Sequence, residues 1–231
     1  MSKCNRHSRF PMVVTLITLI FFYAPLIIVA TASFNASKYG GRWTGFSLKW
    51  YQKLFSDYSI WEALSNTLII ALIATFFSTL LGTLAALALY RSRSRFRGLY
   101  YALVYSPLVV PDILLGISLL LLFVSILSLC GAWVEQLTGI KMELGMTTII
   151  IAHITFCMSY VTMVVLGRLQ DFDSSLIEAA QDLGANSFQT FFKVTLPVIS
   201  PGVIAGALFA FTLSIDDFVI TFFVKGAGDT T

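Results

Sequence analysis

Five long apolar runs alternate with polar segments along this chain of 231 residues. A helix needs about 20 mostly apolar residues to cross the hydrocarbon of a bilayer, and each run reaches that length. The pattern therefore predicts an all-α, polytopic membrane protein with one transmembrane domain over residues 1–231. The expected spans cover residues 10–32, 66–90, 99–129, 147–166 and 201–224.

The first run follows a basic start, in which Lys3, Arg6 and Arg9 have no acidic neighbour. A cleaved signal peptide begins in the same way. This run, however, is longer than the hydrophobic region of a signal peptide, contains Pro25 and lacks a small-residue cleavage site. We therefore expect an uncleaved first membrane helix.

The loop between the second and third runs is strongly basic. Its four arginines, without any acid, are Arg91, Arg93, Arg95 and Arg97. A short basic loop between two spans is typical of the cytoplasmic side, and we favour this interpretation over a nucleic-acid site. Counting spans from residues 91–98 then places the N-terminus and residues 171–197 in the cytoplasm as well.

The third run is long for one span and contains two prolines four positions apart, Pro107 and Pro111. A proline removes a backbone donor and crowds the preceding turn of a helix. Broken backbone is tolerated within a membrane where it meets protein or a watery cavity. We expect a third helix that is broken near its middle, with Asp112 at the break.

Small residues recur at helical spacing in the second and fifth runs. Such stripes let two membrane helices approach closely, so we interpret them as packing faces. They comprise Ala71, Thr75, Ser78, Gly82 and Ala86 in the second run and Gly202, Gly206, Ala210 and Ser214 in the fifth.

Composition agrees with lipid as the solvent, since 57% of the residues are hydrophobic, 12% are charged and the mean hydropathy is +0.84. The net charge of +3 gives no argument for nucleic acid.

Cys4, Cys130 and Cys157 are far apart, which supports neither a disulfide framework nor a metal site. His153 is expected to hydrogen-bond between helices rather than bind a metal. Without a Walker loop or a GxSxG motif, the chain is not expected to hydrolyse ATP or to act as an enzyme.

Three acids lie within the apolar runs, namely Asp112, Asp216 and Asp217, and no lysine or arginine accompanies them inside any run. An acid in a span costs roughly 2.5–3.5 kcal/mol on insertion scales, so each marks a pathway or a pair. The acids are protonated, paired with another subunit, or available to a cation such as an organic amine. A structural pair and a proton-carrying site remain alternatives.

An intramembrane aspartyl protease is a further alternative for this acid pair. Adjacent residues on one helix point about 100° apart, so Asp216 and Asp217 cannot easily share one water molecule. The only GxGD sequence, at residues 226–229, lies beyond the last apolar run, so the two-helix arrangement of such proteases is also absent. We therefore do not favour proteolysis.

A polar segment separates the last two runs. Ser174 or Ser175 is expected to cap a short helix with Glu178 in its first turn, and Gly184 permits the turn with positive φ that ends it. A second helical piece over residues 187–194 should follow and be closed by Pro197. Leu176 and its apolar neighbours form an exposed face that needs a groove on a partner.

The spacing of this segment resembles the EAA motif of importer permeases of the ATP-binding-cassette (ABC) class. That motif reads EAA, three residues, Gly, nine residues, Ile or Val, one residue, Leu-Pro. It is matched here by Glu178, Ala179, Ala180, Gly184, Val194, Leu196 and Pro197. An unrelated amphipathic loop would not predict these spacings.

The resemblance implies a type I ABC importer permease bundle, with five spans present of an expected six. In that family the segment at about 171–197 is a cytoplasmic coupling helix that docks on the ATPase. The chain would then be a multi-pass protein of the bacterial inner membrane.

A second resemblance concerns the cargo. The sequence from Thr212 to Asp217, together with Ser106 to Asp112, is similar to the polyamine (spermidine/putrescine) branch, specifically its second permease type. This implies a substrate pathway formed by Trp50, Asp112, Ser214, Asp216 and Asp217. Trp50 either offers its ring face to an amine or anchors the chain at the membrane interface.

The implied partners are an ATP-binding cassette ATPase dimer, a homologous permease subunit, a periplasmic or lipid-anchored polyamine-binding protein and membrane lipid, without nucleic acid. ATP and magnesium would be bound by the ATPase, and no cofactor is expected in this chain. An importer for iron, thiamine or an anion shares the EAA loop and remains an alternative, as does a secondary carrier.

Overall fold

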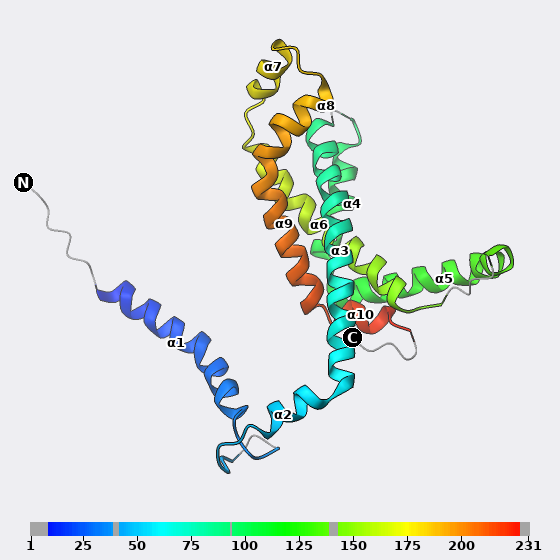
Figure 1. Cartoon of the computed structure of the whole chain (residues 1–231). Helices are drawn as coiled ribbons and strands as arrows, with labels where there is room; N and C mark the ends of the chain where they lie inside the picture. Colours follow the sequence, from blue (N-terminus) through cyan, green and yellow to red (C-terminus); the bar gives the residue numbers. More distant parts are fainter. Residues whose placement is uncertain (1–8, 39–41, 93, 139–142, 227–231) are drawn as a thin grey trace, which may run out of the picture. The chain divides into compact units, whose positions relative to one another are not determined.

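The computed structural model describes residues 9–38, 42–92, 94–138 and 143–226, and these residues are almost entirely helical (Figure 1). They fall into two compact units, residues 1–61 and 62–231, which are described separately. Cys4 and Arg93 lie outside the described residues, and so does the side chain of Cys130.

The first unit contains α1 (Arg9–Ala32), α2 (Lys49–Ser56) and the first residues of α3 (Tyr58–Arg91). The loop between α1 and α2 is organised by Asn35, which is only 3% exposed. Its Oδ1 accepts hydrogen bonds from the backbone N–H groups of Ser37 and Thr44, and its Nδ2 donates to the carbonyl of Arg42. One asparagine therefore replaces the hydrogen bonds that regular structure would supply.

The second unit is built around α6 (Met146–Gln170), which packs along α9 (Leu196–Asp216). The stripes of small residues explain this contact. A Cβ added at Gly82 of α3 would lie 2.8 Å from Cβ of Val161, and one added at Gly206 of α9 would lie 3.3 Å from its Cγ1. Val161 thus fills the space that the two glycines leave open, and the predicted packing faces are confirmed.

The third apolar run forms two helices, α4 (Arg97–Val109) and α5 (Asp112–Thr138), so the predicted break is confirmed. Val110 is extended (φ −74°, ψ 131°), as expected for a residue before a proline. The two helices run in different directions from the break and have different neighbours (Figure 1): α4 packs on α6, whereas α5 packs on α10 (Val219–Val224).

Pro107 lies inside α4 and Pro201 inside α9 without ending either helix. In each case the carbonyl four residues back has lost its N–H partner. The preceding serine takes its place, because the Ser106 hydroxyl donates to the Leu103 carbonyl at 3.1 Å and the Ser200 hydroxyl to the Pro197 carbonyl at 2.8 Å.

The polar segment before α9 begins with α7 (Ser175–Asp182). The turn predicted at Gly184 is confirmed, with φ at +83°. The N–H of Gly184 binds the Gln181 carbonyl and the N–H of Ala185 binds the Ala180 carbonyl, which is the hydrogen-bond pattern of a Schellman motif. The predicted serine cap is wrong: no side chain of Ser174 caps α7, and Asp173 accepts the Ser175 N–H at 2.9 Å instead.

The prediction that Pro197 closes the next helical piece is also wrong. Helix α8 (Ser187–Thr190) runs through a π-helical turn, η1 (Phe191–Thr195), directly into α9, and Pro197 lies in the first turn of α9. A proline ring crowds the carbonyl four residues earlier, and the wider π turn relieves this contact without stopping the helix. The fifth helix therefore begins at Leu196, before Pro201.

The predicted fifth span, 201–224, is not one helix. Helix α9 ends at Asp216. The backbone of Asp217 is extended (φ −73°, ψ 109°), and α10 follows it. No proline explains this second break, and its cause is a set of side-chain contacts described below.

Five helical segments are long and apolar enough to cross a membrane among the described residues, as the sequence predicts. The second begins at Tyr58 rather than at residue 66, and the third starts at Asp112 because α4 is too short to count. The five are Phe10–Ala32, Tyr58–Arg91, Asp112–Leu129, Met146–Gln170 and Ser187–Asp216.

Candidate functional site

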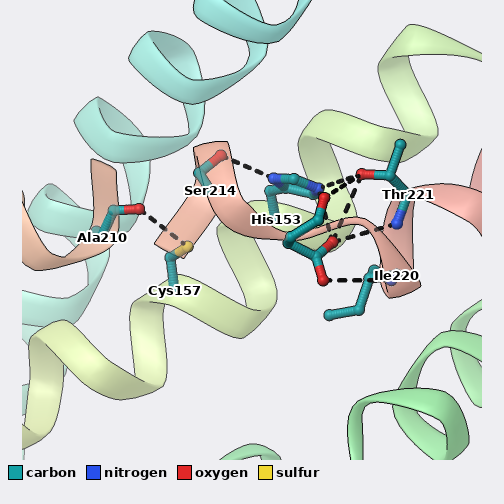
Figure 2. Close-up of polar contacts among 7 residues, drawn as sticks. His153, Cys157, Ala210, Ser214, Ile220 and Thr221 are labelled. Atoms are coloured by element: carbon teal, nitrogen blue, oxygen red, sulfur yellow. Dashed lines mark hydrogen bonds and ion pairs between the residues drawn. The ribbon is translucent and has the colours of Figure 1, made fainter. Parts of the chain in front are cut away.

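A group of polar side chains is buried where α9 ends and α10 begins, against α6 (Figure 2). His153 of α6 is 2% exposed. Its Nδ1 lies 2.7 Å from the Ser214 hydroxyl, while its Nε2 lies 2.9 Å from the Thr221 hydroxyl and 3.3 Å from Oδ2 of Asp217. One α6 residue thus joins the helices on both sides of the break, which confirms the predicted hydrogen-bonding role of His153.

One arrangement of protons satisfies all of these contacts when Asp217 is ionised. A carboxylate only accepts hydrogen bonds, and a neutral imidazole donates from one nitrogen and accepts at the other. The Nε2–H of His153 therefore donates toward Thr221 and Asp217, and Nδ1 accepts from the Ser214 hydroxyl. The Thr221 hydroxyl in turn donates to Asp217, with 3.3 Å to its carbonyl oxygen and 3.5 Å to Oδ2.

Asp217 also caps α10. Its Oδ1 accepts the backbone N–H of Ile220 at 3.3 Å, and its Oδ2 accepts that of Thr221 at 3.2 Å. These N–H groups have no partner within the helix, and a carboxylate is favoured at this end of the helix dipole. The side chain of Asp217 is 7% exposed. Its charge is therefore held by the protein itself.

Asp216, the neighbouring acid, behaves differently. It is exposed at the end of α9 and, within the described part of the chain, its side chain has no hydrogen-bond or ion-pair partner. It borders a cavity of about 140 Å³ together with Phe218, which is 72% exposed. The other residues that line this cavity are Thr67, Ile70, His153, Ser214, Ile215, Asp217 and Thr221.

The structure gathers only part of the predicted substrate pathway around this cavity. Ser214, Asp216 and Asp217 line it, whereas Asp112 does not. Asp112 is the first residue of α5, exposed, and without a side-chain partner within the described ranges.

Trp50 belongs to the first unit and is described there by itself. Its indole N–H donates to the carbonyl of Asn35 at 3.0 Å, which fixes the ring against the loop between α1 and α2. The ammonium of Lys49 lies 4.8 Å from the ring centroid. Of the two alternatives for Trp50, the one in which its ring meets an amine has to compete with this cation from the neighbouring residue.

Sequence reasoning missed Thr67 and Thr221. Thr221 follows Asp217 by four residues, so an acid that caps a new helix was the available signal. The continuous apolar run around Asp217 instead favoured a single unbroken helix. Among the described residues, no three histidine, cysteine, aspartate or glutamate side chains cluster in a way that could hold a metal ion.

The residues predicted to couple to an ATPase lie at the opposite end of α9 from this cavity (Figure 1). Glu178 and Ala179 are exposed on α7, Ala180 is half-buried, and Gly184 is exposed at the turn. Leu196 and Pro197 open α9. Large apolar side chains in the same segment are exposed, namely Leu176, Leu183, Phe188 and Phe192.

Asp173 begins this segment as the cap of α7. It is exposed, and the backbone N–H of Ser175, followed by the Ser175 hydroxyl, lowers the pKa of its carboxyl below the ordinary value. A hydrogen bond to the charged form favours that form, which explains the direction.

Comparison with known proteins gives findings of three kinds, from a protein family, from named relatives and from solved structures. The family described as "Binding-protein-dependent transport system inner membrane component" matches residues 78–231. The putrescine transport system permease protein PotI of Escherichia coli (strain K12) is 43% identical over 226 residues, covering 97% of this chain and 77% of PotI. The spermidine/putrescine transport system permease protein PotC of the same strain is 40% identical over 206 residues, covering 89% of this chain and 73% of PotC.

The third finding comes from solved structures. A bacterial ABC transporter involved in the import of the acidic polysaccharide alginate matches with a TM-score of 0.72, covering 94% of this chain and 78% of that chain. The two are 17% identical in sequence, so this likeness supports the fold alone.

Proposed function

The chain belongs to the family of binding-protein-dependent transport system inner membrane components, and we propose that it forms half of the channel of an ATP-driven importer for putrescine or spermidine. It lies in the bacterial inner membrane with its N-terminus in the cytoplasm. A homologous permease supplies the other half, and a periplasmic or lipid-anchored binding protein delivers the cargo.

The observation that carries this proposal is the cavity beside Asp216. Its lining contains two carboxylates and no lysine or arginine. An ammonium group can exchange its water for carboxylate oxygens, whereas an anionic cargo would need basic groups. The relatives named above, which transport putrescine or spermidine by name, support the same choice.

Residues 171–197 are proposed to dock on an ATPase dimer that binds ATP and magnesium. The exposed apolar side chains of Leu176, Leu183 and Phe188 support this role, because an apolar surface exposed to the cytoplasm is stabilised by burial against a partner protein. The docked segment continues through η1 into α9 without an intervening loop. Movement of the segment is therefore passed along α9 toward Ser214 and Asp216, as alternating access requires.

The coupling role is tested by Glu178→Ala and Gly184→Trp, introduced separately into the gene in its host cell. Gly184 has a φ of +83° with open space around its Cβ position, so tryptophan strains the turn and blocks docking rather than the membrane core. We expect ATP-driven putrescine uptake to fall by about tenfold or more, with normal amounts of protein in the membrane. Retained uptake in both variants would count against coupling.

Gly98→Trp is the matched control. It adds the same side chain at the start of α4, within the expected cytoplasmic loop, where a new Cβ also meets nothing within 4 Å. We expect near-normal uptake. Uptake into vesicles without ATP would instead favour a secondary carrier.

A further inference from the structure

We propose that the two neighbouring acids at the end of α9 do different work: Asp216 meets the ammonium group of the cargo, whereas His153 holds Asp217 inside the protein as a positioning residue for the helix break. This inference rests on the proposed function and deepens it. It assigns to His153 a role in the transport site, and it removes Asp217 and Ser214 from direct contact with cargo.

The contacts of Asp217 leave little room for a ligand. Both carboxylate oxygens already accept backbone N–H groups at the start of α10, and Oδ2 also faces His153 and the Thr221 hydroxyl. The side chain is 7% exposed. A cation that bound here would have to displace the cap of α10, leaving buried N–H groups unpaired.

Ser214 is held in the same way. It is 3% exposed, and its hydroxyl is engaged by Nδ1 of His153 at 2.7 Å. Ser214 closes the stripe of small residues on α9 that packs against α6. The imidazole therefore fixes the last turn of α9 with one nitrogen and the cap of α10 with the other, so the angle between the two helices depends on His153.

Asp216 is the acid that this framework leaves accessible. It is exposed, has no side-chain partner in the described ranges, and borders the same cavity as Phe218. A carboxylate next to an exposed aromatic ring suits an alkylammonium group, because the carboxylate supplies charge and the ring supplies a cation–π contact. The cavity of about 140 Å³ has space for one amine end rather than for a whole polyamine.

Two pairs of substitutions separate charge from geometry. At Asp216 the charge matters, so Asp216→Glu should keep putrescine uptake within about threefold and Asp216→Asn should lower it by about tenfold or more. At Asp217 the shape of the side chain matters more than its charge, so here we expect the asparagine variant to retain more uptake than the glutamate variant. Asparagine keeps Oδ1 as the acceptor for the Ile220 N–H and loses only the acceptor for the Thr221 N–H. Its NH₂ can donate to Nε2 of His153 once the imidazole proton moves to Nδ1, whereas the longer glutamate does not fit the cap.

We therefore expect Asp217→Asn to keep uptake within about threefold and Asp217→Glu to lower it by about tenfold. Uptake of labelled putrescine and spermidine is measured in the host cell, relative to the amount of protein in the membrane. Equal losses in Asp216→Asn and Asp217→Asn would overturn the proposal, since both acids would then meet the cargo through their charge.

His153 is tested by His153→Phe, which removes both hydrogen bonds, and by His153→Gln, which retains a donor and an acceptor. We expect a loss of about tenfold for phenylalanine and partial recovery with glutamine. Because His153 acts through Asp217, uptake by the double variant His153→Phe, Asp217→Glu should be no lower than by either single variant. Independent, multiplying losses would overturn the positioning role.

Cys157→Ala is the matched control for a general loosening of α6. Cys157 lies one turn from His153, and its thiol donates to the Ala210 carbonyl at 3.6 Å, so it joins α6 to α9 and makes no hydrogen bond with Asp217 (Figure 2). We expect uptake within about twofold of the unsubstituted protein. A loss as large as that of His153→Phe would overturn the specific role of His153. A host whose putrescine and spermidine uptake is unaffected by deletion of the gene would instead refute the proposed function.

Discussion

The chain breaks two of its membrane helices, and it does so by two different means. Between α4 and α5 the break lies at Val110 and Pro111, where the proline ring disfavours a helical Val110. Between α9 and α10 the break lies at Asp217, where no proline occurs and side chains from three helices hold the extended backbone. Both breaks have an aspartate, but Asp112 is exposed, whereas the side chain of Asp217 is only 7% exposed.

The two breaks depend on their surroundings to different degrees. A proline acts through its own covalent structure, so we expect the first break to depend less on the packing around it than the second break does. The second includes contacts from His153 on α6, so we expect it to change when α6 moves. A break held by side chains that are distant in sequence can respond to helix movement, whereas a break at a proline is expected to keep its backbone conformation. We therefore place the moving part of the site at Asp217.

The two breaks also meet, and this contact is the first place to disturb them. A Cβ added at Gly116 of α5 would lie 2.8 Å from Cδ2 of Phe223 and 3.5 Å from Cα of Ile220 on α10. Gly116→Val should therefore push the two helices apart and destabilise the protein by about 1–3 kcal/mol. In detergent this corresponds to a fall in Tm of about 2–12 °C.

Gly131→Val is the control for this largest effect. It introduces the same residue into the same helix, where a new Cβ meets nothing within 4 Å. Its Tm should stay close to that of the unsubstituted protein. Equal falls in the two variants would mean that valine acts through helix propensity and that α5 and α10 do not support each other.

Local patterns in the sequence were sufficient for much of this fold. Long apolar runs and small-residue stripes act within one helix or between helices whose packing requires only closeness, so they can be recognised without coordinates. The turn at Gly184 was predictable for the same reason, since only one residue type readily adopts its conformation. The break at Pro111 belongs with these features.

The second break and its network were not predictable. His153 and Asp217 are 64 residues apart in the chain, and their contact exists only once α6 and α9 pack together. Pro197 is ambiguous in a related way, because a proline at the start of a span can end one helix or begin the next. Only the π turn of η1 decides that the chain continues.

A smaller effect is expected at the proline break itself. Pro111→Ala restores the backbone donor and frees Val110 to adopt the helical conformation, from which a proline excludes it at about 3 kcal/mol or more. We expect α4 and α5 to approach one continuous helix. Spin labels at Leu103 and Leu121, both exposed, should then move toward a separation of about 27 Å, the length of 18 helical residues.

Pro107→Ala provides the comparison, because Pro107 lies within α4 without ending it. The label separation should not change in this variant. If Pro111→Ala also left the separation unchanged, the first break would be held by packing, and the contrast with Asp217 would be lost.

The smallest effect concerns Asp173, an exposed carboxylate that accepts one backbone N–H at the start of α7, whereas Asp217 accepts two at the start of α10. Its lowered pKa means that the folded state favours the carboxylate, so its contribution to α7 is complete above the ordinary pKa of about 4 and is lost only as the pH falls through the lower folded value. Asp173→Ala should speed amide exchange in α7 by about twofold to threefold, and Asp173→Asn, which keeps an acceptor, should not. Between about pH 5 and 8 this protection should not change apart from the intrinsic exchange rate. If amide protection in α7 declined between about pH 5 and 8, or stayed unchanged in Asp173→Ala, Asp173 would not be the cap of α7. A carboxylate cap in this chain would then require the low exposure that Asp217 has.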